Sequence, residues 1–422
     1  MVVAGAGPAG IPAAIAAARG GAKVILLEED ATVGGAPVDM FVTMICGGPQ
    51  IGIFKEMLDE LKAMYDIRPE NKPEGVWFSP SAFALVLNNM LAREKNIRLV
   101  CAAPVVGALL EEASAGAKIS ALEYACPGGA KALAKGKVFI DATGTGVVSE
   151  FAGARVMYGR EAKSDFNEPL ALEKADTLVM PCTWMGLAQR FRRGAALDLS
   201  KMPFKGALDS GYGFANDPVH GTLRAEADSY LHWLCASLCD TRDPLALAKL
   251  QSELLQGAIK KAMDEYYKQG FILNLAPRIG VRECRRIMGH AVITSEDIRA
   301  SLRHEDTIAM GCYAFDAWGR NYLPKDVDLS KTFTFAIPYR ACVAKGLKNL
   351  FTAGKIISGT SLALTVYRVQ PILACVGQGV GSAAAEAALK GASPENIDVK
   401  KLQASLIAQG SLPKNWQTVE RL

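Results

Sequence analysis

Three glycines near the N-terminus have a spacing that suits contact with a phosphate group. The pattern Gly-x-Gly-x-x-Gly is formed by Gly5, Gly7 and Gly10. An apolar run precedes it, and an alanine-rich stretch from Pro12 to Arg19 follows. The first glycine allows a tight turn, the second lets a pyrophosphate approach the backbone, and the third lets a helix pack on a strand. Because the start of a helix also attracts anions, this stretch predicts a strand, a phosphate-binding turn and a helix.

A carboxylate follows at the distance expected for a nucleotide ribose. Residues 23–29 (KVILLEE) predict a second strand that ends in Glu28 and Glu29. Glu28 lies about twenty residues beyond the turn, where a carboxylate can hold the ribose hydroxyls of an adenosine. Since strand, turn, helix, strand and acid occur in this order, the sequence predicts a dinucleotide-binding unit. The next glycine pair, Gly34 and Gly35, is not needed for NAD and is typical of flavoproteins.

The charge balance argues against a strongly anionic partner. The 422 residues include 47 Lys and Arg and 43 Asp and Glu, a net charge of +4, whereas nucleic acids and anionic membranes require clustered positive charge. The apolar N-terminus lacks the basic segment of a signal peptide, and no other run reaches membrane-spanning length. We therefore expect no nucleic-acid partner and no membrane span.

The ten cysteines are scattered along the chain without a CxxC pair. This usage predicts reduced, buried thiols in a cytoplasmic protein, with no disulfide framework, metal site or iron–sulfur cluster. Only Cys235 and Cys239 are close in sequence. They lie in an apolar stretch (YLHWLCASLC) that is predicted to be a core helix.

Apolar periodicity and turn residues predict the remaining elements of an α/β chain. Helices are expected over residues 54–66, 81–95, 221–238, 245–268, 295–303 and 371–390. Strands are expected over residues 97–101, 105–111, 118–124, 130–134, 137–146, 177–185, 332–340 and 350–354. The strands at 137–146 and 350–354 end in glycine and are expected to join the N-terminal sheet. Both ends of the chain then build one sheet, with a second part inserted between them.

Several motifs occur in an order that resembles a known family. They are VVAGAGPAG…LLEE…GG, DATGTGVVSEFAGA, PRIGVRECRRIMGHAVITSEDI, IPYRACVAKGLKNLFTAGK and YRVQPILACVGQGVGSAAA. Together they resemble the FAD-dependent oxidoreductase family of the glutathione-reductase-like superfamily. A more distant likeness is to the flavin subunit of heterodisulfide reductases and to fumarate-reductase-like proteins.

The resemblance implies a set of FAD contacts. These are Gly5, Gly7, Pro8, Ala9 and Gly10 at the pyrophosphate, Glu28 with neighbouring Glu29 at the ribose, Gly34 and Gly35 on the path to the flavin, Val105 at the adenine, Ala142, Thr143 and Gly144 over the cofactor, Gly354 and Lys355 at the pyrophosphate and ribityl chain, and Gly377, Gln378 and Gly379 at the flavin pyrimidine. The chain departs from the family at Lys355, where arginine is more common, and after Gly144, where an acid is more common. A helix starting near Val376 to Gly379 would stabilise negative charge on a reduced flavin.

A basic run from Arg278 to Met288 offers substrate contacts. In a strand, Arg278, Arg282 and Arg286 would share one face, and Glu283 and Arg285 the other. Two interpretations stay open. Either Arg282 or Arg286 holds an anionic or carbonyl-bearing substrate beside the flavin, or the run forms ion pairs that tie the two parts of the chain together.

Further candidates for the substrate side lie close to this run or follow from the resemblance. Arg368 would lie near the flavin by its place in the family. His290, directly after the run, is the best acid–base candidate among the histidines, although a packed or surface role is the more common one for such a residue. Glu283 completes the predicted catalytic set of Arg282, Glu283, His290 and Arg368.

The sequence thus predicts an α/β fold with a Rossmann-like FAD-binding domain and an inserted α+β substrate domain. The FAD-binding parts are residues 1–150 and 345–395, the substrate or cap part is 151–344, and 396–422 is a C-terminal tail. The expected function is hydride transfer between a small organic substrate and non-covalently bound FAD. The alternatives are an electron-transfer subunit with a partner protein and a non-catalytic flavin-binding protein; a homo-oligomer is also possible.

Overall fold

A five-stranded parallel sheet forms the centre of the protein in the computed structural model, which describes residues 1–64, 78–111, 116–190, 229–260, 264, 270–317, 322–324 and 327–420. The strand order is β15-β7-β1-β2-β3. The strands are β1 (Val2–Ala4), β2 (Val24–Leu27), β3 (Ile97–Val100), β7 (Phe139–Asp141) and β15 (Leu350–Thr352). Strands from both ends of the chain therefore belong to one sheet, as predicted from the sequence, with β7 between β1 and β15.

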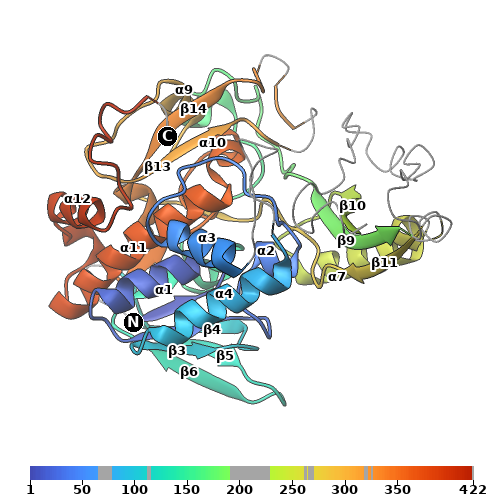
Figure 1. Ribbon diagram of the computed structural model, residues 1–422. Helices are drawn as coiled ribbons and strands as arrows, with labels where there is room; N and C mark the ends of the chain where they lie inside the picture. Colours follow the sequence, from blue (N-terminus) through green and yellow to red (C-terminus); the bar gives the residue numbers. More distant parts are fainter. Residues whose placement is uncertain are drawn as a thin grey trace.

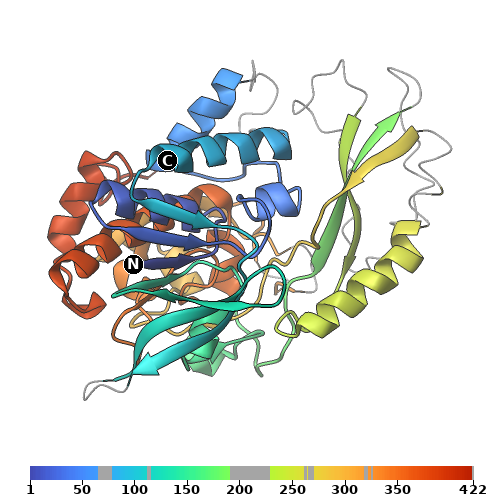
Figure 2. The same ribbon diagram turned by 90° about the horizontal axis from the view of Figure 1, so that it is seen from below.

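Different layers cover the two faces of this sheet (Figure 1, Figure 2). Successive residues of a strand point to opposite faces, so Val3 and Ile140 enter a core shared with helices, whereas Val2 and Phe139 enter a second core shared with a meander. The helices are α1 (Gly10–Arg19), α3 (Gly52–Met64), α4 (Pro80–Arg93) and α11 (Gln370–Lys390). The meander consists of β4 (Val105–Glu111), β5 (Lys118–Ala125) and β6 (Lys131–Lys135), paired antiparallel as predicted.

Helices α1 and α11 approach each other through glycines of α11. A Cβ atom on Gly377 would lie 2.0 Å from the carbonyl oxygen of Ala9, and one on Gly381 would lie 2.2 Å from that of Ala13. No side chain fits at either position. The glycines in this helix, which cost helix stability, are therefore explained by close helix packing.

This packing corrects one prediction. The helix begins at Gln370, so Gly377, Gln378 and Gly379 lie well inside it and do not form its start. Gly379 lies against Ile308, and the Gln378 side chain accepts a hydrogen bond from the backbone N–H of Ile53 at 2.9 Å. The sequence interpretation erred because glycines suit a helix–helix contact as well as an approach to a flat ring.

A second group of elements projects from one side of the central body (Figure 1, Figure 2). An antiparallel sheet with the order β10-β9-β11 lies beside a helix. Its elements are β9 (Cys182–Arg190), β10 (Ser229–Ser237), α7 (Pro244–Leu254), η3 (Leu255–Ile259) and β11 (Gly270–Leu275). The predicted substrate part also contains an antiparallel pair, β13 (Thr307–Ala314) and β14 (Thr332–Pro338), and this pair packs on the central body through α11. The domain boundaries themselves stay a prediction.

Two segments differ from their predicted conformation. Residues 229–237, predicted as part of a helix, form strand β10, while 221–228 lie outside the described residues. An uninterrupted apolar run fits either conformation, and pairing with β9 decides between them. In the basic run, β12 (Arg286–Ile287) alone is a strand, paired with β8 (Val156–Met157). The predicted common face of its arginines therefore does not form.

The other helices are short, apart from one near the C-terminus. They are α2 (Ala36–Asp39), α5 (Val147–Phe151), α6 (Lys163–Phe166), α9 (Ser295–Arg299), η4 (Tyr339–Cys342), α10 (Ser361–Tyr367), η5 (Pro394–Asn396) and α12 (Val399–Ala408). Among the described helices, α11 is the one long and apolar enough to cross a membrane, and most of its apolar stretch is buried inside the protein.

Candidate active site

A pocket lies at the carboxyl edge of the central sheet. Its wall includes the residues that follow four adjacent strands: Glu28 after β2, Gly5 after β1, Ala142 after β7 and Gly354 after β15. Neighbouring strands are about 4.8 Å apart, so these positions span about 14 Å. A pocket that crosses several strand ends suits an extended nucleotide, because ligands of open α/β sheets bind at this edge.

The glycine turn is tightly packed on one side and open on the other. Gly5 has a φ of +98°, and a Cβ there would lie 2.4 Å from the carbonyl oxygen of Ala142. A Cβ on Gly10 would lie 1.8 Å from the carbonyl oxygen of Gly5. At Gly7 the nearest atom to such a Cβ is Cα of Gly35 at 3.8 Å, which leaves space beside the backbone. A phosphate group fits this cradle at the start of α1.

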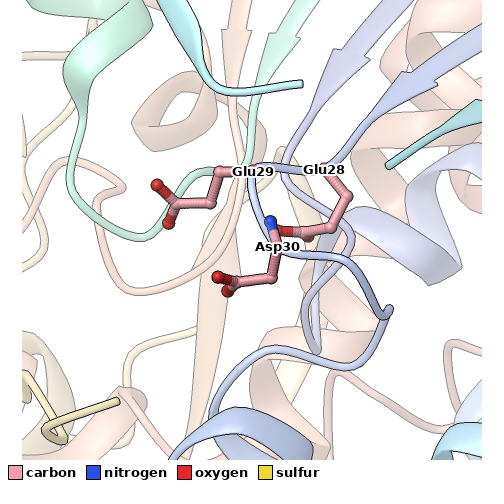
Figure 3. A group of neighbouring side chains, drawn as sticks. All are labelled: Glu28, Glu29 and Asp30. Carbon is pink, nitrogen blue, oxygen red and sulfur yellow. The ribbon is translucent and has the colours of Figure 1, made fainter. Parts of the chain in front are cut away.

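Three acidic residues, Glu28, Glu29 and Asp30, lie next to one another after β2 (Figure 3). The buried Glu28 carboxylate accepts hydrogen bonds from the backbone N–H groups of Ala6 at 2.5 Å and Asp30 at 3.1 Å. Burial raises the pKa of Glu28 to about 7. Glu29 and Asp30 instead form ion pairs with Arg278, at 2.9 Å for Asp30. Glu28 is thus held against the glycine turn, in the pocket wall.

A buried carboxylate that the sequence did not single out lies close to these acids. Asp39, in α2, lines the pocket and accepts a hydrogen bond from the Thr32 hydroxyl at 3.3 Å. Burial, and then the charge of Asp30, raise the pKa of Asp39 to about 7. Its Oδ2 atom is buried and has no hydrogen-bond partner among the described residues. Because buried polar atoms are nearly always paired, this atom fits a hydroxyl or N–H group of a bound ligand.

A second aspartate fixes the turn after β7. The fully buried Asp141 carboxylate accepts hydrogen bonds from the backbone and hydroxyl of Thr143, at 3.1 and 2.7 Å. It also accepts them from the backbone and hydroxyl of Ser149, at 2.8 and 2.7 Å. These bonds hold Ala142 and Gly144 in the pocket wall. The sequence marks Asp141 only as the end of an apolar strand, so its role was missed.

Three cationic side chains line the pocket toward β15: Arg282, Lys355 and Arg368. The Arg282 guanidinium donates to the carbonyl of Pro181 at 2.9 Å, and the Lys355 amine donates to the carbonyl of Val281. Burial, with a smaller contribution from the charge of Arg368, lowers the pKa of Lys355 to about 8 and that of Arg282 to about 9. The cations therefore lie close enough for their charges to repel one another.

A single described carboxylate in this part of the pocket faces the cations. Asp316 accepts a hydrogen bond from Nη2 of Arg368 at 3.1 Å and one from the Tyr313 hydroxyl at 3.2 Å. Nε of Arg368 is buried without a hydrogen-bond partner among the described residues. A cluster of three cationic side chains in one pocket wall favours a bound anion.

The start of helix α11 also reaches the pocket. Val369, Gln370 and Leu373 belong to its wall. The Gln370 amide donates to the carbonyl of Val42 at 2.8 Å, while its Oε1 atom is buried without a partner in the described chain. The predicted contact between a helix N-terminus and the pocket therefore exists, but at 369–373 rather than at Gly377 to Gly379.

Two predicted catalytic residues lie away from the pocket. Glu283 is buried beneath it, where it accepts hydrogen bonds from the N–H of Met180 at 2.9 Å and the hydroxyl of Tyr322 at 2.7 Å. His290 lies 3.4 Å from Glu395 on the outside of the central body. Both predictions relied on proximity in sequence to Arg282. The chain leaves the pocket wall after Arg282, so neither side chain lines the pocket.

The two interpretations of the basic run apply to different residues. Arg282 lines the pocket, whereas Arg285 pairs with Glu150 at 2.6 Å and Arg278 with Asp30 at 2.9 Å, across the predicted boundary between the two parts. The buried Arg286 pairs with Glu161 at 3.0 Å inside the predicted substrate part. The predicted site residues in the pocket wall are Gly5, Gly7, Pro8, Ala9, Glu28, Glu29, Gly35, Val105, Ala142, Thr143, Gly144, Arg282, Gly354, Lys355 and Arg368. Those outside it are Gly10, Gly34, Glu283, His290, Gly377, Gln378 and Gly379.

Solved structures with a similar chain path show low sequence identity. The THI4 protein of Thermovibrio ammonificans is 18% identical, over 38% of this chain and 65% of that chain, with a TM-score of 0.31. A geranylgeranyl bacteriochlorophyll reductase-like protein of Thermoplasma acidophilum is 13% identical, over 99% and 85%, with a TM-score of 0.46. The p-nitrophenol 4-monooxygenase PnpA of Pseudomonas putida is 13% identical, over 96% and 84%, with a TM-score of 0.39. None of these values supports an inference about reaction or substrate.

The family assignment comes from the sequence model described as FAD dependent oxidoreductase, which matches residues 1–406. No curated protein matches the chain. The glutathione-reductase-like superfamily stays a prediction. Since the match spans nearly the whole chain and the pocket offers a phosphate cradle beside the buried Glu28, this protein belongs to the FAD dependent oxidoreductase family, with FAD as its cofactor.

Proposed function

We propose that this protein transfers hydride between a small anionic organic molecule and non-covalently bound FAD. The observation that carries the proposal is the group of Arg282, Lys355 and Arg368 in the wall of the same pocket as the glycine turn. Bound FAD supplies the acceptor or donor of the two electrons. The reaction class goes beyond the family assignment, which covers many flavin chemistries.

The protein residues hold the cofactor along the sheet edge in this proposal. Glu28 accepts hydrogen bonds from the ribose hydroxyls, and Gly7 with the start of α1 faces the pyrophosphate. Ala142 and Gly354 form the floor of the pocket between these contacts and the cations. The N-terminus of α11, through Gln370, adds a partial positive charge to the same space.

The cations select and orient the substrate. A guanidinium binds a carboxylate through two parallel hydrogen bonds, which fixes the orientation as well as the position of the bound anion. Arg282 and Arg368 present two such groups, and Asp316 anchors Arg368 from behind. Lys355, whose pKa is near 8, adds a charge that changes within the ordinary pH range. These residues therefore bind and orient an anion and exclude water from it.

Two alternatives carry over from the sequence. An electron-transfer subunit would pass electrons to a partner protein, and a non-catalytic member would hold FAD alone. The cluster of Arg282, Lys355 and Arg368 in the pocket wall favours a small anion over either alternative, because neither alternative requires several cations in the same pocket as the cofactor. A small-molecule substrate without nucleic acid or membrane is the partner we propose.

The test is anaerobic bleaching of the bound flavin with matched small molecules. We expect carboxylate-bearing compounds to reduce the flavin and their amides or methyl esters to fail. If the physiological direction is reduction, NADH or NADPH bleaches the flavin and a carboxylate-bearing acceptor restores the colour. Equal reaction of the acids and their neutral esters, or reduction by a protein partner alone, would overturn the proposal.

A further inference from the structure

Two buried polar side chains lie where the start of α11 contacts the loop after α2. The Gln370 amide donates to the carbonyl of Val42 at 2.8 Å, so its nitrogen is engaged and its Oε1 atom is fixed as an acceptor. Thr43 follows Val42, and its backbone N–H donates to the carbonyl of Phe41 at 2.9 Å. Thr43 is 1% exposed and Gln370 8%, and both line the pocket. The two segments therefore hold a hydroxyl and an amide oxygen in the pocket wall.

Both groups lack a hydrogen-bond partner within the described part of the chain. Oε1 of Gln370 and Oγ1 of Thr43 are buried and unpaired there, and so is one atom of each of two other pocket residues, Asp39 and Arg368. Arg368 belongs to the cationic group. The Asp39 carbonyl accepts a hydrogen bond from the backbone N–H of Arg278 at 2.9 Å, which places Asp39 beside the acids after β2. Since buried polar groups are nearly always paired, Gln370 and Thr43 are arranged to contact a ligand.

The chemistry of these two groups indicates which part of a ligand they contact. An amide oxygen needs an N–H or O–H donor, and a carboxylate has none, so the anion that the cations favour does not satisfy Gln370. The ring of FAD carries such a donor, because its pyrimidine edge is an imide with N3–H between two carbonyl groups. An acceptor from Gln370 and a donor from Thr43 match this N–H and one of the adjacent carbonyls.

The position of the two groups along the pocket agrees with this match. Glu28 and Gly7 face the adenosine and the pyrophosphate at the ends of β2 and β1. An extended FAD then continues past β1 toward β7 and β15, the strands on which α11 packs. The start of α11, with Gln370, therefore lies on the side of the pocket that is left for the ring.

We propose that Gln370 and Thr43 recognise the imide edge of the FAD ring. Oε1 of Gln370 accepts a hydrogen bond from N3–H, and the Thr43 hydroxyl donates to one of the adjacent ring carbonyls. The hydrogen bond from Gln370 to Val42 positions both groups, because it ties the start of α11 to the loop that carries Thr43. The proposal concerns cofactor recognition and does not depend on the reaction that the bound flavin carries out.

The test compares FAD with 3-methyl-FAD, in which a methyl group replaces the hydrogen on N3. Full-chain holoprotein is equilibrated with a mixture of the two, free flavin is removed, and the bound flavins are separated by chromatography. We expect the wild type to prefer FAD by about 10-fold or more, because the methylated ring cannot donate and leaves Oε1 of Gln370 unpaired. In Gln370→Ala, which removes the acceptor and makes room for the methyl group, the preference should fall to about twofold or less.

Two further variants serve as controls. Gln378→Ala removes a buried glutamine of the same helix that lies outside the pocket, so the preference for FAD should keep its wild-type value. Thr43→Val should bind both flavins about 2- to 10-fold more weakly and keep the preference, because the hydroxyl donates to a carbonyl that both flavins carry.

Equal binding of the two flavins by the wild type overturns the proposal, and so does a preference for FAD that persists in Gln370→Ala. If Gln370→Ala fails to fold, Gln370→Asn, which withdraws the amide oxygen by one methylene group, takes its place. The wild-type comparison needs no variant. No substrate is present in this experiment, so failure of the carboxylate test above leaves its outcome unaffected.

Discussion

The Glu28 carboxylate accepts a hydrogen bond from the backbone N–H of Ala6, 2.5 Å away, inside the glycine turn. This contact links the end of β2 to the phosphate-binding loop after β1, two strands that are neighbours in the sheet. The residue expected to hold the ribose therefore also holds the loop that faces the pyrophosphate.

The first prediction concerns the pH dependence of FAD binding. Burial raises the pKa of Glu28 to about 7, and the ribose hydroxyls need the ionised form as an acceptor. FAD affinity should therefore increase as the pH rises through about 7, measured by fluorescence titration of the apoprotein. Glu28→Gln should bind more weakly and lose most of this dependence. Asp39→Asn measures separately the contribution of the second pocket carboxylate with a pKa of about 7. An unchanged pH profile in Glu28→Gln would contradict the assignment.

The second prediction concerns the two pocket arginines. Hydrogen bonds to charged groups contribute about 1.5–3 kcal/mol, so Arg282→Gln or Arg368→Gln should weaken binding of a carboxylate ligand by about 10- to 150-fold. Lysine should restore only part of this loss, because it lacks the planar fork. Arg340→Gln is the control, since its side chain is exposed and pairs with Asp306. The measurement is the perturbation of the flavin absorbance by the ligand. Equal effects of all three substitutions would argue against a specific anion site.

The third prediction separates Lys355 from the arginines by pH. Its amine is charged below about 8 and neutral above it, so the affinity for a carboxylate ligand should fall as the pH rises through about 8. Lys355→Arg should move this fall to higher pH, and Lys355→Met should bind weakly on both sides of it. The same absorbance titration, repeated across the pH range, measures the effect. A wild-type affinity that stays constant through pH 8 would be inconsistent with a ligand contact by Lys355.

The sequence was sufficient for those parts of the fold that depend on local rules. Gly5, Gly10 and the apolar strands have steric requirements that act over a few residues. The glycines that end the strands at 137–146 and 350–354 predicted that both join the N-terminal sheet, which they do as β7 and β15. Strand β10 could not be predicted in the same way, because its apolar run gains its conformation from pairing with β9.

The site was only partly predictable for a related reason. Arg282, Asp316 and Arg368 come from three segments that are distant in sequence. A motif with fixed spacing therefore could not identify this group of charged side chains. The glycines of α11 could serve either close helix packing or an approach to a flat ring. The contact of Gly377 with the backbone of Ala9 shows that they serve helix packing. Glu283 follows Arg282 directly in sequence, but its carboxylate contacts the buried Tyr322 hydroxyl and does not line the pocket. Proximity in sequence alone therefore does not place a side chain in the site.

The fourth prediction concerns the contact between α1 and α11. A methyl group at position 377 would collide with backbone atoms of Ala9, which cannot move without shifting the phosphate cradle. Overpacking usually costs about 1–3 kcal/mol, so Gly377→Ala should lower the midpoint of thermal unfolding and weaken FAD retention together. Gly257→Ala is the control, because nothing lies within 4 Å of a Cβ there. A Gly377→Ala protein as stable as wild type would show that the helices can separate freely.

The fifth prediction concerns the buried charges behind the pocket. Arg286 is fully buried, 3.0 Å from Glu161 and 3.8 Å from Glu283. Removing one partner of a buried pair costs about 3–5 kcal/mol, because the remaining charge stays without compensation. Arg286→Met should therefore destabilise the protein strongly in denaturant unfolding, whereas Arg299→Gln, on the surface, should not.

A double variant tests the cause of that loss. If the unpaired carboxylate is responsible, Glu161→Gln added to Arg286→Met should recover part of the stability, because a neutral amide is less costly to bury than a carboxylate. The free energies of the single and double variants give the coupling between the two side chains. If the two losses simply add, the pair is not coupled, and Arg286 stabilises the fold through its hydrogen bond to the Gly159 carbonyl and its packing instead.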